Sequence, residues 1–382
     1  MTTAIDDDFL SGQGVPVDLH DVPAELARLW GPAAEQAGAS TSPNPNVTRV
    51  VLANLVLFCR QADASRLPGV LEAVAARYPS RIIGLRRDES PGRSLRAEVS
   101  ALCHLPAPGL PQVCSERIVL RAGPDAVDLL PGAVRPLLEA DLPFVLWWTD
   151  DPRRDETLFR DLGEECSRLI LDLPDPGTDP SALRLGLDPS ICRFSRDAVW
   201  FGLTRWRELI AQFFDPPCAG QSLSLLDRIR VEAASPAPCE APRLAVWLLA
   251  WLAGQLNWTP GGTPDRAEGR LSATFQGPNG PVAVEILTSV DSSLEEPLIQ
   301  SVELTTRGSG DEGPERFQLR RESNAVGKVR VEVDSPSHCA LPRTVLAPEV
   351  DAPRRIAAAL ESSRNDPPFQ HAMPHASWLL GL

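Results

Sequence analysis

Residues 141–174 read "DLPFVLWWTDDPRRDETLFRDLGEECSRLILDLP", and this stretch decides the fold. After Pro143 comes the apolar run Phe144–Trp148, followed by a helical pattern over Asp155–Cys166 and a second apolar run over Arg168–Leu173. A buried strand, a helix and another buried strand in this order predict a βαβ unit, whose parallel strands are covered on both faces.

The adjacent tryptophans of this stretch, Trp147 and Trp148, need separate environments. Neighbouring side chains of a strand point to opposite faces of the sheet. We therefore expect one indole to pack in the core and the other to face the surface loop Thr149–Arg154. One segment does not fix the phase of a strand, so which indole does which stays open.

An earlier stretch repeats the pattern. Val47–Cys59 is a continuous aliphatic run that predicts one strand, Leu67–Arg77 has helical spacing, and "SRIIGL" at 80–85 predicts the next strand. Leu95–Leu105 and Val113–Leu120 alternate and would extend the sheet with antiparallel strands.

These two βαβ-like halves predict a Rossmann-like mixed sheet with flanking helices over residues 47–175. Asp125–Glu139 is expected to form one of these helices, although it contains Pro131 and Pro136. Residues 1–46 are interpreted as an amino-terminal arm with a short helix over Val22–Trp30.

The rest of the chain changes character twice. Residues 176–262 are interpreted as a helix-rich segment packing on the first domain, with helices over 203–215, where Thr204 is the expected N-cap, and over 242–258. Residues 263–382 predict a smaller α+β region with a terminal helix and tail. Its short alternating runs predict an antiparallel meander of five strands: 271–275, 282–287, 299–305, 316–320 and 326–333.

Composition excludes several classes of function. The net charge of −14 argues against nonspecific nucleic-acid binding, which needs clustered basic residues. Met1–Leu10 resembles no targeting signal, and the apolar helix Leu244–Leu256 is shorter than the roughly 20 residues that span a bilayer, so we expect a cytoplasmic protein that binds no membrane. Eight scattered cysteines without a CxxC pair are expected to be mostly reduced buried thiols.

The sequence lacks the motifs of catalysis and cofactor binding. The run after Cys59 reads "RQADASRLPG", without the glycines that bring a backbone close to a pyrophosphate. There is no P-loop, no GxSxG elbow and no metal-ligand spacing such as HExxH. We therefore expect no catalytic residues, no cofactor and no metal, and a protein that is not an enzyme.

Aromatic residues stand in unusual places. Nine tryptophans accompany a single tyrosine, and several tryptophans lie beside arginine, the other residue enriched at interface hot spots. Packing in a thin core is the simpler interpretation of any one of them. The alternative makes seven residues candidates for binding a partner protein: Trp147, Trp148, Asp150, Arg153, Arg205, Trp206 and Arg207.

Several of these motifs, taken in order, resemble a known family. They are "VTRVVLANLVLFC", "YPSRIIGL", "QVCSERIVL", "VRPLLEADLPFVLWWTDDP", "SRLILDL", "LTRWRELIAQFFD" and "LAVWLLAWLAGQLNW". Together they are similar to the OpcA family of glucose-6-phosphate dehydrogenase assembly proteins, over about residues 48–258.

The resemblance implies a Rossmann-like module, a mixed α+β carboxyl-terminal region and no catalytic activity. It implies an accessory protein that binds glucose-6-phosphate dehydrogenase, promotes its active oligomer and so supports the oxidative pentose phosphate pathway and NADPH supply. In some members cysteines take part in thioredoxin-linked redox control, which the resemblance assigns to no particular cysteine of this chain.

Two other interpretations stay open. The α/β layer would also suit a nucleotide- or sugar-phosphate-binding regulator or enzyme, which thermal shift with such ligands would reveal. The chain would alternatively be a self-associating structural protein, which light scattering would reveal.

Overall fold

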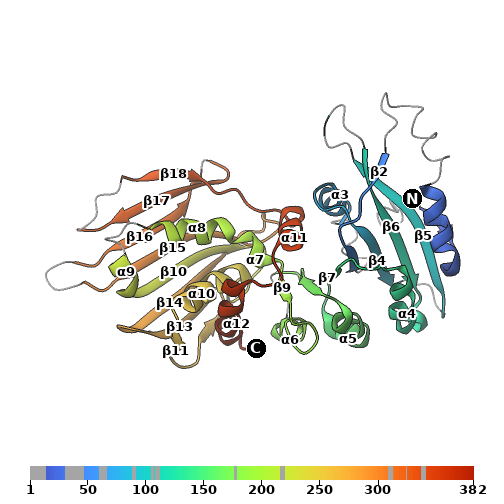
Figure 1. Ribbon diagram of the computed structural model, residues 1–382. Helices are drawn as coiled ribbons and strands as arrows, with labels where there is room; N and C mark the ends of the chain where they lie inside the picture. The colour runs from blue at the N-terminus through green and yellow to red at the C-terminus, as the bar shows by residue number, and fades with distance from the viewer. Residues whose placement is uncertain are drawn as a thin grey trace, which may run out of the picture. The chain divides into compact units, whose positions relative to one another are not determined.

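The computed structural model describes residues 14–30, 47–59, 67–87, 92–104, 107, 112–175, 179–215, 220–308, 313–323, 325–336 and 341–382. These residues form two compact units, each built from segments that are separate in the sequence. Unit 1 comprises residues up to 173 with 185–198 and 352–364, and unit 2 comprises 174–184, 199–351 and 365–382. Figure 1 labels most of the helices and strands of both.

Unit 1 is built on a nine-stranded sheet with the path β1-β5-β6-β4-β3-β7-β8-β9, and β2 pairs with β6 beside this path. The strands are β1 (Val15–Val17), β2 (Val47–Arg49), β3 (Asn54–Cys59), β4 (Arg81–Arg87), β5 (Leu95–His104), β6 (Gln112–Ala122), β7 (Phe144–Trp148), β8 (Arg168–Leu171) and β9 (Ser195–Asp197). The prediction of a mixed α/β fold is confirmed.

The central strands of this sheet are parallel, and β5 pairs antiparallel with both β1 and β6. Numbered along the chain from β3, the six consecutive parallel strands lie in the order 3-2-1-4-5-6, which is the order of dinucleotide-binding sheets. All six residues of β3 are buried, as its unbroken apolar sequence predicts for a strand covered on both faces.

Helices and short 3-10 turns connect these strands. The helices are α1 (Val22–Leu29), α3 (Leu67–Arg77), α4 (Leu130–Val134), α5 (Glu156–Glu165) and α11 (Ala352–Glu361). The turns are η2 (Leu19–Asp21), η4 (Pro124–Leu129), η5 (Arg135–Leu137) and η6 (Pro152–Asp155).

Helix α11 comes from the far end of the chain and packs against α3. Arg77 at the end of α3 forms an ion pair with Glu361, with Nε 2.6 Å from Oε1. Arg168 at the start of β8 donates to the carbonyl oxygens of Leu360 and Ser362, at 2.9 and 2.7 Å. Residues 352–364 are therefore an integral part of unit 1.

Two predictions for unit 1 are wrong in detail. The run Val47–Cys59 forms two strands instead of one, because β2 pairs with β6 while β3 pairs with β4 and β7. The expected helix Asp125–Glu139 is divided into η4, α4 and η5. Pro131 and Pro136 lack the backbone donors that a continuous α-helix requires.

Unit 2 is built on a second nine-stranded sheet with the path β11-β13-β14-β10-β15-β16-β17-β18, and β12 pairs with β13 beside it. The strands are β10 (Leu226–Ser235), β11 (Thr259–Pro260), β12 (Asp265–Ala267), β13 (Arg270–Gly277), β14 (Gly280–Val290), β15 (Leu298–Thr306), β16 (Arg316–Arg321), β17 (Lys328–Asp334) and β18 (Arg343–Leu346).

Strand β10 is the main departure from prediction in unit 2. It lies between β14 and β15, parallel to the first and antiparallel to the second, so the predicted uninterrupted meander is wrong at this point. It also falls in a segment interpreted as helix-rich. Its alternation of buried Ile229, Val231 and Ala233 with more exposed Arg228 and Arg230 is a strand pattern that the interpretation missed.

The helices of unit 2 pack on one face of this sheet, where α10 contacts β10, β14 and β15. They are α7 (Val199–Gly202), α8 (Thr204–Gln212), α9 (Gly220–Ser224), α10 (Arg243–Gln255) and α12 (Pro367–Leu380), and α6 (Pro180–Gly186) precedes β9 in the chain. Figure 1 shows α8 and α10 lying along the strands of this sheet.

Aromatic rings join α7, α10 and α12. Trp247 of α10 stacks on Phe369 of α12 with ring centroids 4.8 Å apart, and Trp200 of α7 meets both rings edge-on at 5.9 and 5.2 Å. Helix α8 begins at Thr204, with Leu203 as its N-cap, so the predicted capping role of Thr204 is wrong. Its hydroxyl instead donates to the carbonyl oxygen of Phe201, at 3.2 Å.

Candidate functional site

The strand order of unit 1 indicates where a ligand would bind. In open parallel sheets ligands bind beyond the carboxyl ends of the strands, at the point where the strand order reverses. In unit 1 that point lies between β3 and β7, at Cys59 and Trp148. Trp148 is followed closely by the predicted partner-binding residues Asp150 and Arg153. The geometry of this edge therefore bears on both a ligand site and a partner-binding site.

Trp148 fills one face of the sheet beside this point. It is paired in register with Phe58, and the two rings are stacked with centroids 4.0 Å apart. Phe159 of α5 meets the indole edge-on at 5.0 Å. Trp148 is therefore fully buried, at 0% exposure, and its Nε1 has no hydrogen-bond partner among the residues described.

Trp147 is equally buried on the opposite face, beside Leu57 and Ile170 of the neighbouring strands. The expectation that one of the two tryptophans faces a surface loop is therefore wrong. β7 is a central parallel strand, and such strands are covered on both faces. A partner protein has no access to either indole in the folded chain.

Carboxylates surround the end of β7. Thr149 donates to the carbonyl oxygen of Phe58 through both N and Oγ1, each at 3.2 Å, and so continues the strand pairing. Asp150 is buried, and its Oδ1 accepts from the backbone N of Asp151 at 2.7 Å. Asp151 in turn binds Arg153, with Arg153 Nη2 2.6 Å from Asp151 Oδ2. Carboxylates therefore occupy the strand ends where a bound phosphate would need hydrogen-bond donors.

Asp155 is a titratable group that sequence reasoning missed. It is buried at the start of α5, and its Oδ1 lies 2.8 Å from Nη2 of Arg87 at the end of β4. Burial raises its pKa, and Arg87 and Arg154 oppose this shift. Its Oδ2 has no hydrogen-bond partner among the described residues. An aspartate just inside a helix after "DDP" was the available signal, but the sequence did not show that it is buried.

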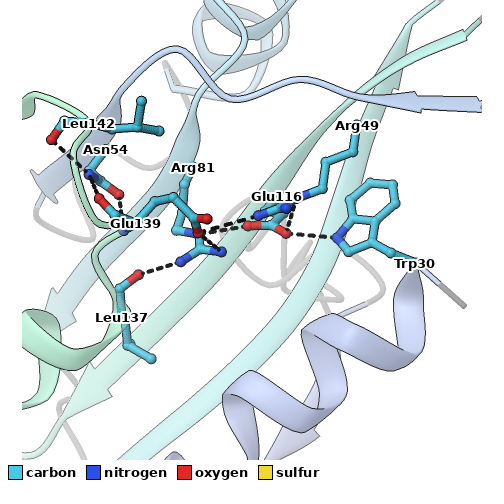
Figure 2. Close-up of polar contacts among 8 residues, drawn as sticks. All are labelled: Trp30, Arg49, Asn54, Arg81, Glu116, Leu137, Glu139 and Leu142. Carbon is cyan, nitrogen blue, oxygen red and sulfur yellow. Dashed lines mark hydrogen bonds and ion pairs between the residues drawn. The ribbon is translucent and has the colours of Figure 1, made fainter.

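The amino ends of the same strands hold a buried ion network (Figure 2). Glu116 of β6 is 1% exposed. Its Oε1 accepts from Nε1 of Trp30 at 2.7 Å and lies 2.6 Å from Nε of Arg49. Its Oε2 accepts from Nε of Arg81 at 2.6 Å. Arg81 also lies 2.6 Å from Oε2 of Glu139.

Asn54 extends this network to the start of β3. Its Nδ2 donates to the carbonyl oxygens of Glu139 and Leu142, at 3.0 and 3.4 Å, and its Oδ1 accepts from the backbone N of Glu139 at 2.7 Å (Figure 2). The two carboxylates of the network are balanced by two guanidinium groups. Such a satisfied network fixes strands and loops in place.

The remaining candidates lie in unit 2 and have structural contacts there. Trp206 is buried, 5.6 Å from the guanidinium carbon of Arg321. Arg205 donates to the carbonyl oxygen of Leu346 at 3.1 Å and forms an ion pair with Glu208, while 36% of its side chain stays exposed.

Arg207 is the most buried charge of this group. Its guanidinium lies 3.8 Å from the ring centroid of Trp200, and burial lowers its pKa to about 10. Trp200 donates from Nε1 to Asp366 at the N-cap of α12, at 3.0 Å. The predicted residues 205–207 therefore hold α8, α7 and β18 together.

Four of the six described cysteines are free thiols, and the other two form a disulfide that the sequence did not predict. Cys103 and Cys114 face each other across β5 and β6 and form a disulfide. Cys59, Cys166, Cys192 and Cys239 are free thiols. A hydrogen bond between the thiols of Cys166 and Cys192 lowers the pKa of Cys192 to about 7 and raises that of Cys166. Cys218 and Cys339 lie outside the described residues.

Potential metal ligands gather in one place in the described part of the chain. Asp18, His20 and Asp21 lie close together before α1, and all three are exposed to solvent. Exposed acidic groups of this kind are common without a metal, and we assign no site to them. No helix in the described ranges is both long and apolar enough to cross a membrane.

Comparison with known proteins places the chain in a family. Residues 71–185 match the family described as the glucose-6-phosphate dehydrogenase subunit N-terminal domain, OpcA, and residues 194–373 match its C-terminal domain. The chain belongs to the OpcA family. The family predicted from the ordered motifs is thereby confirmed, and the match extends through the carboxyl-terminal region, which those motifs did not cover.

Curated relatives agree with this membership. Proteins named as OxPP cycle protein OpcA from Nostoc punctiforme and Synechococcus elongatus are 29% and 30% identical over 197 and 190 residues. These alignments cover 50% and 49% of this chain, but only 41% and 42% of the two relatives. The chain thus matches less than half the length of either relative.

Oxidoreductases are among the solved structures that match the chain. An oxidoreductase from Sinorhizobium meliloti matches with a TM-score of 0.44 and 9% identity, covering 86% of this chain and 95% of that protein. A scyllo-inositol dehydrogenase from Lactobacillus casei matches with a TM-score of 0.40 and 8% identity, covering 87% and 90%. Likeness at this level says nothing about activity.

Proposed function

We propose that this chain is a non-catalytic accessory protein that binds glucose-6-phosphate dehydrogenase and favours its active oligomer. The observation that carries this proposal is the family match in both halves of the chain, since both matched domains are described as those of a glucose-6-phosphate dehydrogenase subunit. The relatives' name, OxPP cycle protein, supports the same pathway. The proposed place of action is the cytoplasm.

The switch point of unit 1 supports a role without catalysis. Trp148 fills one face of the sheet there, and the buried carboxylates Asp150 and Asp155 lie at the strand ends where a pyrophosphate would need donors and positive charge. If this sheet binds no dinucleotide, it is free to serve as a scaffold for contacts with another protein.

Activation by a binding protein requires only differential affinity. If the chain binds the active form of the dehydrogenase better than the inactive form, it shifts the equilibrium toward the active form. A coupling free energy of roughly 1–3 kcal/mol corresponds to a change of about 5- to 150-fold in apparent substrate affinity.

The exposed arginines among the sequence candidates are the proposed contacts. Trp147, Trp148 and Trp206 are buried and would act only by holding their neighbours in place. Arg153 and Arg205 keep 38% and 36% of their side chains exposed, and arginine is enriched at interface hot spots.

Co-elution with the dehydrogenase from the same source tests the proposal. We expect the two purified proteins to elute together at micromolar concentration and the apparent substrate affinity of the dehydrogenase to change. Separate elution with unchanged kinetics would rule out the proposed function.

A matched pair of variants tests the contact residue. Arg153 and Arg160 are arginines 38% and 39% exposed, each bound to a nearby carboxylate. We expect Arg153→Glu to weaken dehydrogenase binding by at least about tenfold, and Arg160→Glu to change it little. Equal effects of both would remove Arg153 from the interface without affecting the proposed function.

A nucleotide- or sugar-phosphate-binding regulator is the second candidate. The strand order of unit 1 favours it, because this order is the one that dinucleotide-binding sheets use. Thermal unfolding with NADP, ATP or sugar phosphates, without dehydrogenase, tests it. A reproducible rise in Tm with one of these ligands would favour this candidate, and no shift with any of them would exclude it.

A further inference from the structure

The sheet of unit 2 has one face turned away from its helices. On β10 the side chains of Ile229 and Val231 point to the helices and are 0% exposed, and Arg228, Arg230 and Glu232 point the other way. We call the second side the outer face. It consists of the residues in register with these three on β12 to β17.

Charge on the outer face is arranged in rows that run across the strands. The acidic row has four carboxylates and one arginine: Asp265, Glu285, Arg230, Glu303 and Glu332, in register across β12, β14, β10, β15 and β17. The basic row lies two residues away along each strand and has three arginines and one carboxylate: Arg270, Glu232, Arg320 and Arg330.

These rows are accessible and unequally neutralised. Arg270 and Arg330 keep 52% and 50% of their side chains exposed. Arg320 and Arg330 lie directly opposite each other on β16 and β17, and like charges in this position destabilise a sheet. Within the face, Arg330 is paired with Glu332 at 2.6 Å and Arg270 with Glu285 at 3.0 Å, but Arg320 has no ion-pair partner among the described residues.

The spacing of the rows makes the outer face complementary to itself. Side chains two residues apart on a strand are separated by about 6.6–6.8 Å. Consider a two-fold axis that runs parallel to the two rows and midway between them, just above the outer face. Rotation about this axis brings the outer face of a second copy against this one, with the acidic row of the second copy opposite the basic row of the first. Arg320 would then lie over Gln318 of a second copy, between the Glu303 and Glu332 side chains that flank Gln318 in register. The same axis sets Arg230 against Glu232.

We propose that two copies of this chain pair through the outer faces of their unit 2 sheets. Such an interface is isologous, so every contact of the basic row with the acidic row occurs twice. Charged rows supply register and specificity, and the many polar groups keep the interface wet and sensitive to salt. This inference is independent of the proposed binding to the dehydrogenase.

Charge reversal with rescue tests the pairing. Light scattering of the purified full chain at low ionic strength and micromolar concentration should give about twice the chain mass of 41.4 kDa. Arg320→Glu and Glu303→Arg should each give monomers, because each sets like charges together twice. The double variant Arg320→Glu/Glu303→Arg should restore the dimer, and so should an equimolar mixture of the two single variants.

Controls separate loss of pairing from loss of folding. Circular dichroism and Tm should be unchanged in both single variants, and Arg93→Glu, at an exposed ion pair with Asp128 in unit 1, should stay dimeric. Rescue on mixing requires folded partners, so it tests the pairing even if a single variant loses stability. A monomeric wild-type chain, or single variants that remain dimers, would overturn the inference.

Discussion

Replacing Trp148 with alanine should destabilise the centre of unit 1. The indole is fully buried, stacked on Phe58 and in edge contact with Phe159. Removing a buried tryptophan side chain lowers the free energy of unfolding by about 3–5 kcal/mol. The two aromatic pairs, worth roughly 0.5–1.5 kcal/mol each, place Trp148 toward the upper part of this range. We expect a loss of about 3–5 kcal/mol, a large part of the roughly 5–15 kcal/mol that stabilises an ordinary domain.

Hydrogen exchange followed by mass spectrometry reports this loss unit by unit. Peptides covering β3 and β7 should lose protection by about a hundredfold or more, since each 1.4 kcal/mol is tenfold in an opening equilibrium. Peptides from β13 and β14 in unit 2 serve as the internal reference. Trp148→Phe keeps an aromatic ring for the stack and should lose much less protection.

The same measurement on Trp147→Ala completes the test. Its indole is equally buried on the other face, so its loss should be of the same size. If either alanine variant kept wild-type protection in β3 and β7, the inference that both faces of β7 are sealed would be refuted.

Three further perturbations follow from the geometry. Glu116→Gln leaves Arg49 and Arg81 with Glu139 as their remaining carboxylate and should lower the free energy of unfolding by about 1–3 kcal/mol in urea titrations. Gly254→Ala would place a Cβ 2.5 Å from the carbonyl oxygen of His371 and should lower the free energy of unfolding by about 1–3 kcal/mol. The control Gly132→Ala adds a Cβ with no atom within 4 Å and should be neutral or slightly stabilising. Equal Tm values for the two variants would contradict the close α10–α12 contact. Burial raises the pKa of Asp155, so the folded chain binds a proton at this carboxyl more tightly than the unfolded chain does. The free energy of unfolding should therefore fall as pH rises from the ordinary aspartate pKa through the raised one. Asp155→Asn should flatten that part of the pH–stability curve, and an unchanged slope would contradict the raised pKa.

The sequence predicted the parts of the fold that depend on local pattern. Continuous apolar runs identified the parallel strands of unit 1, because a strand covered on both faces has no polar side. The run Val47–Cys59 was misjudged, since an apolar pattern does not show where a chain leaves one strand partner for another. The position of β10 between β14 and β15 depends on pairing with strands far along the chain, which no local pattern contains.

The candidate site was harder to predict for the same reason. The sequence draws attention to Trp147 and Trp148, but the burial of both indoles depends on how much of each sheet face is covered, and that is a property of the whole unit. Contacts in the Glu116 network join residues up to 90 positions apart, and its charged members look like ordinary surface charges in the sequence. Family motifs, by contrast, combine many such distant constraints, and they led to the correct family.

The placement of β10 has a practical consequence for dissecting the molecule. A fragment starting after α10 would lack β10, the strand between β14 and β15. The edges of β14 and β15 would then have unpaired backbone groups and be prone to aggregation. A fragment ending before α11 would likewise lack the helix that packs on α3. Neither unit can be excised at a single cut, so studies of one half alone need rearranged chains in which the missing segment is spliced back through a short linker.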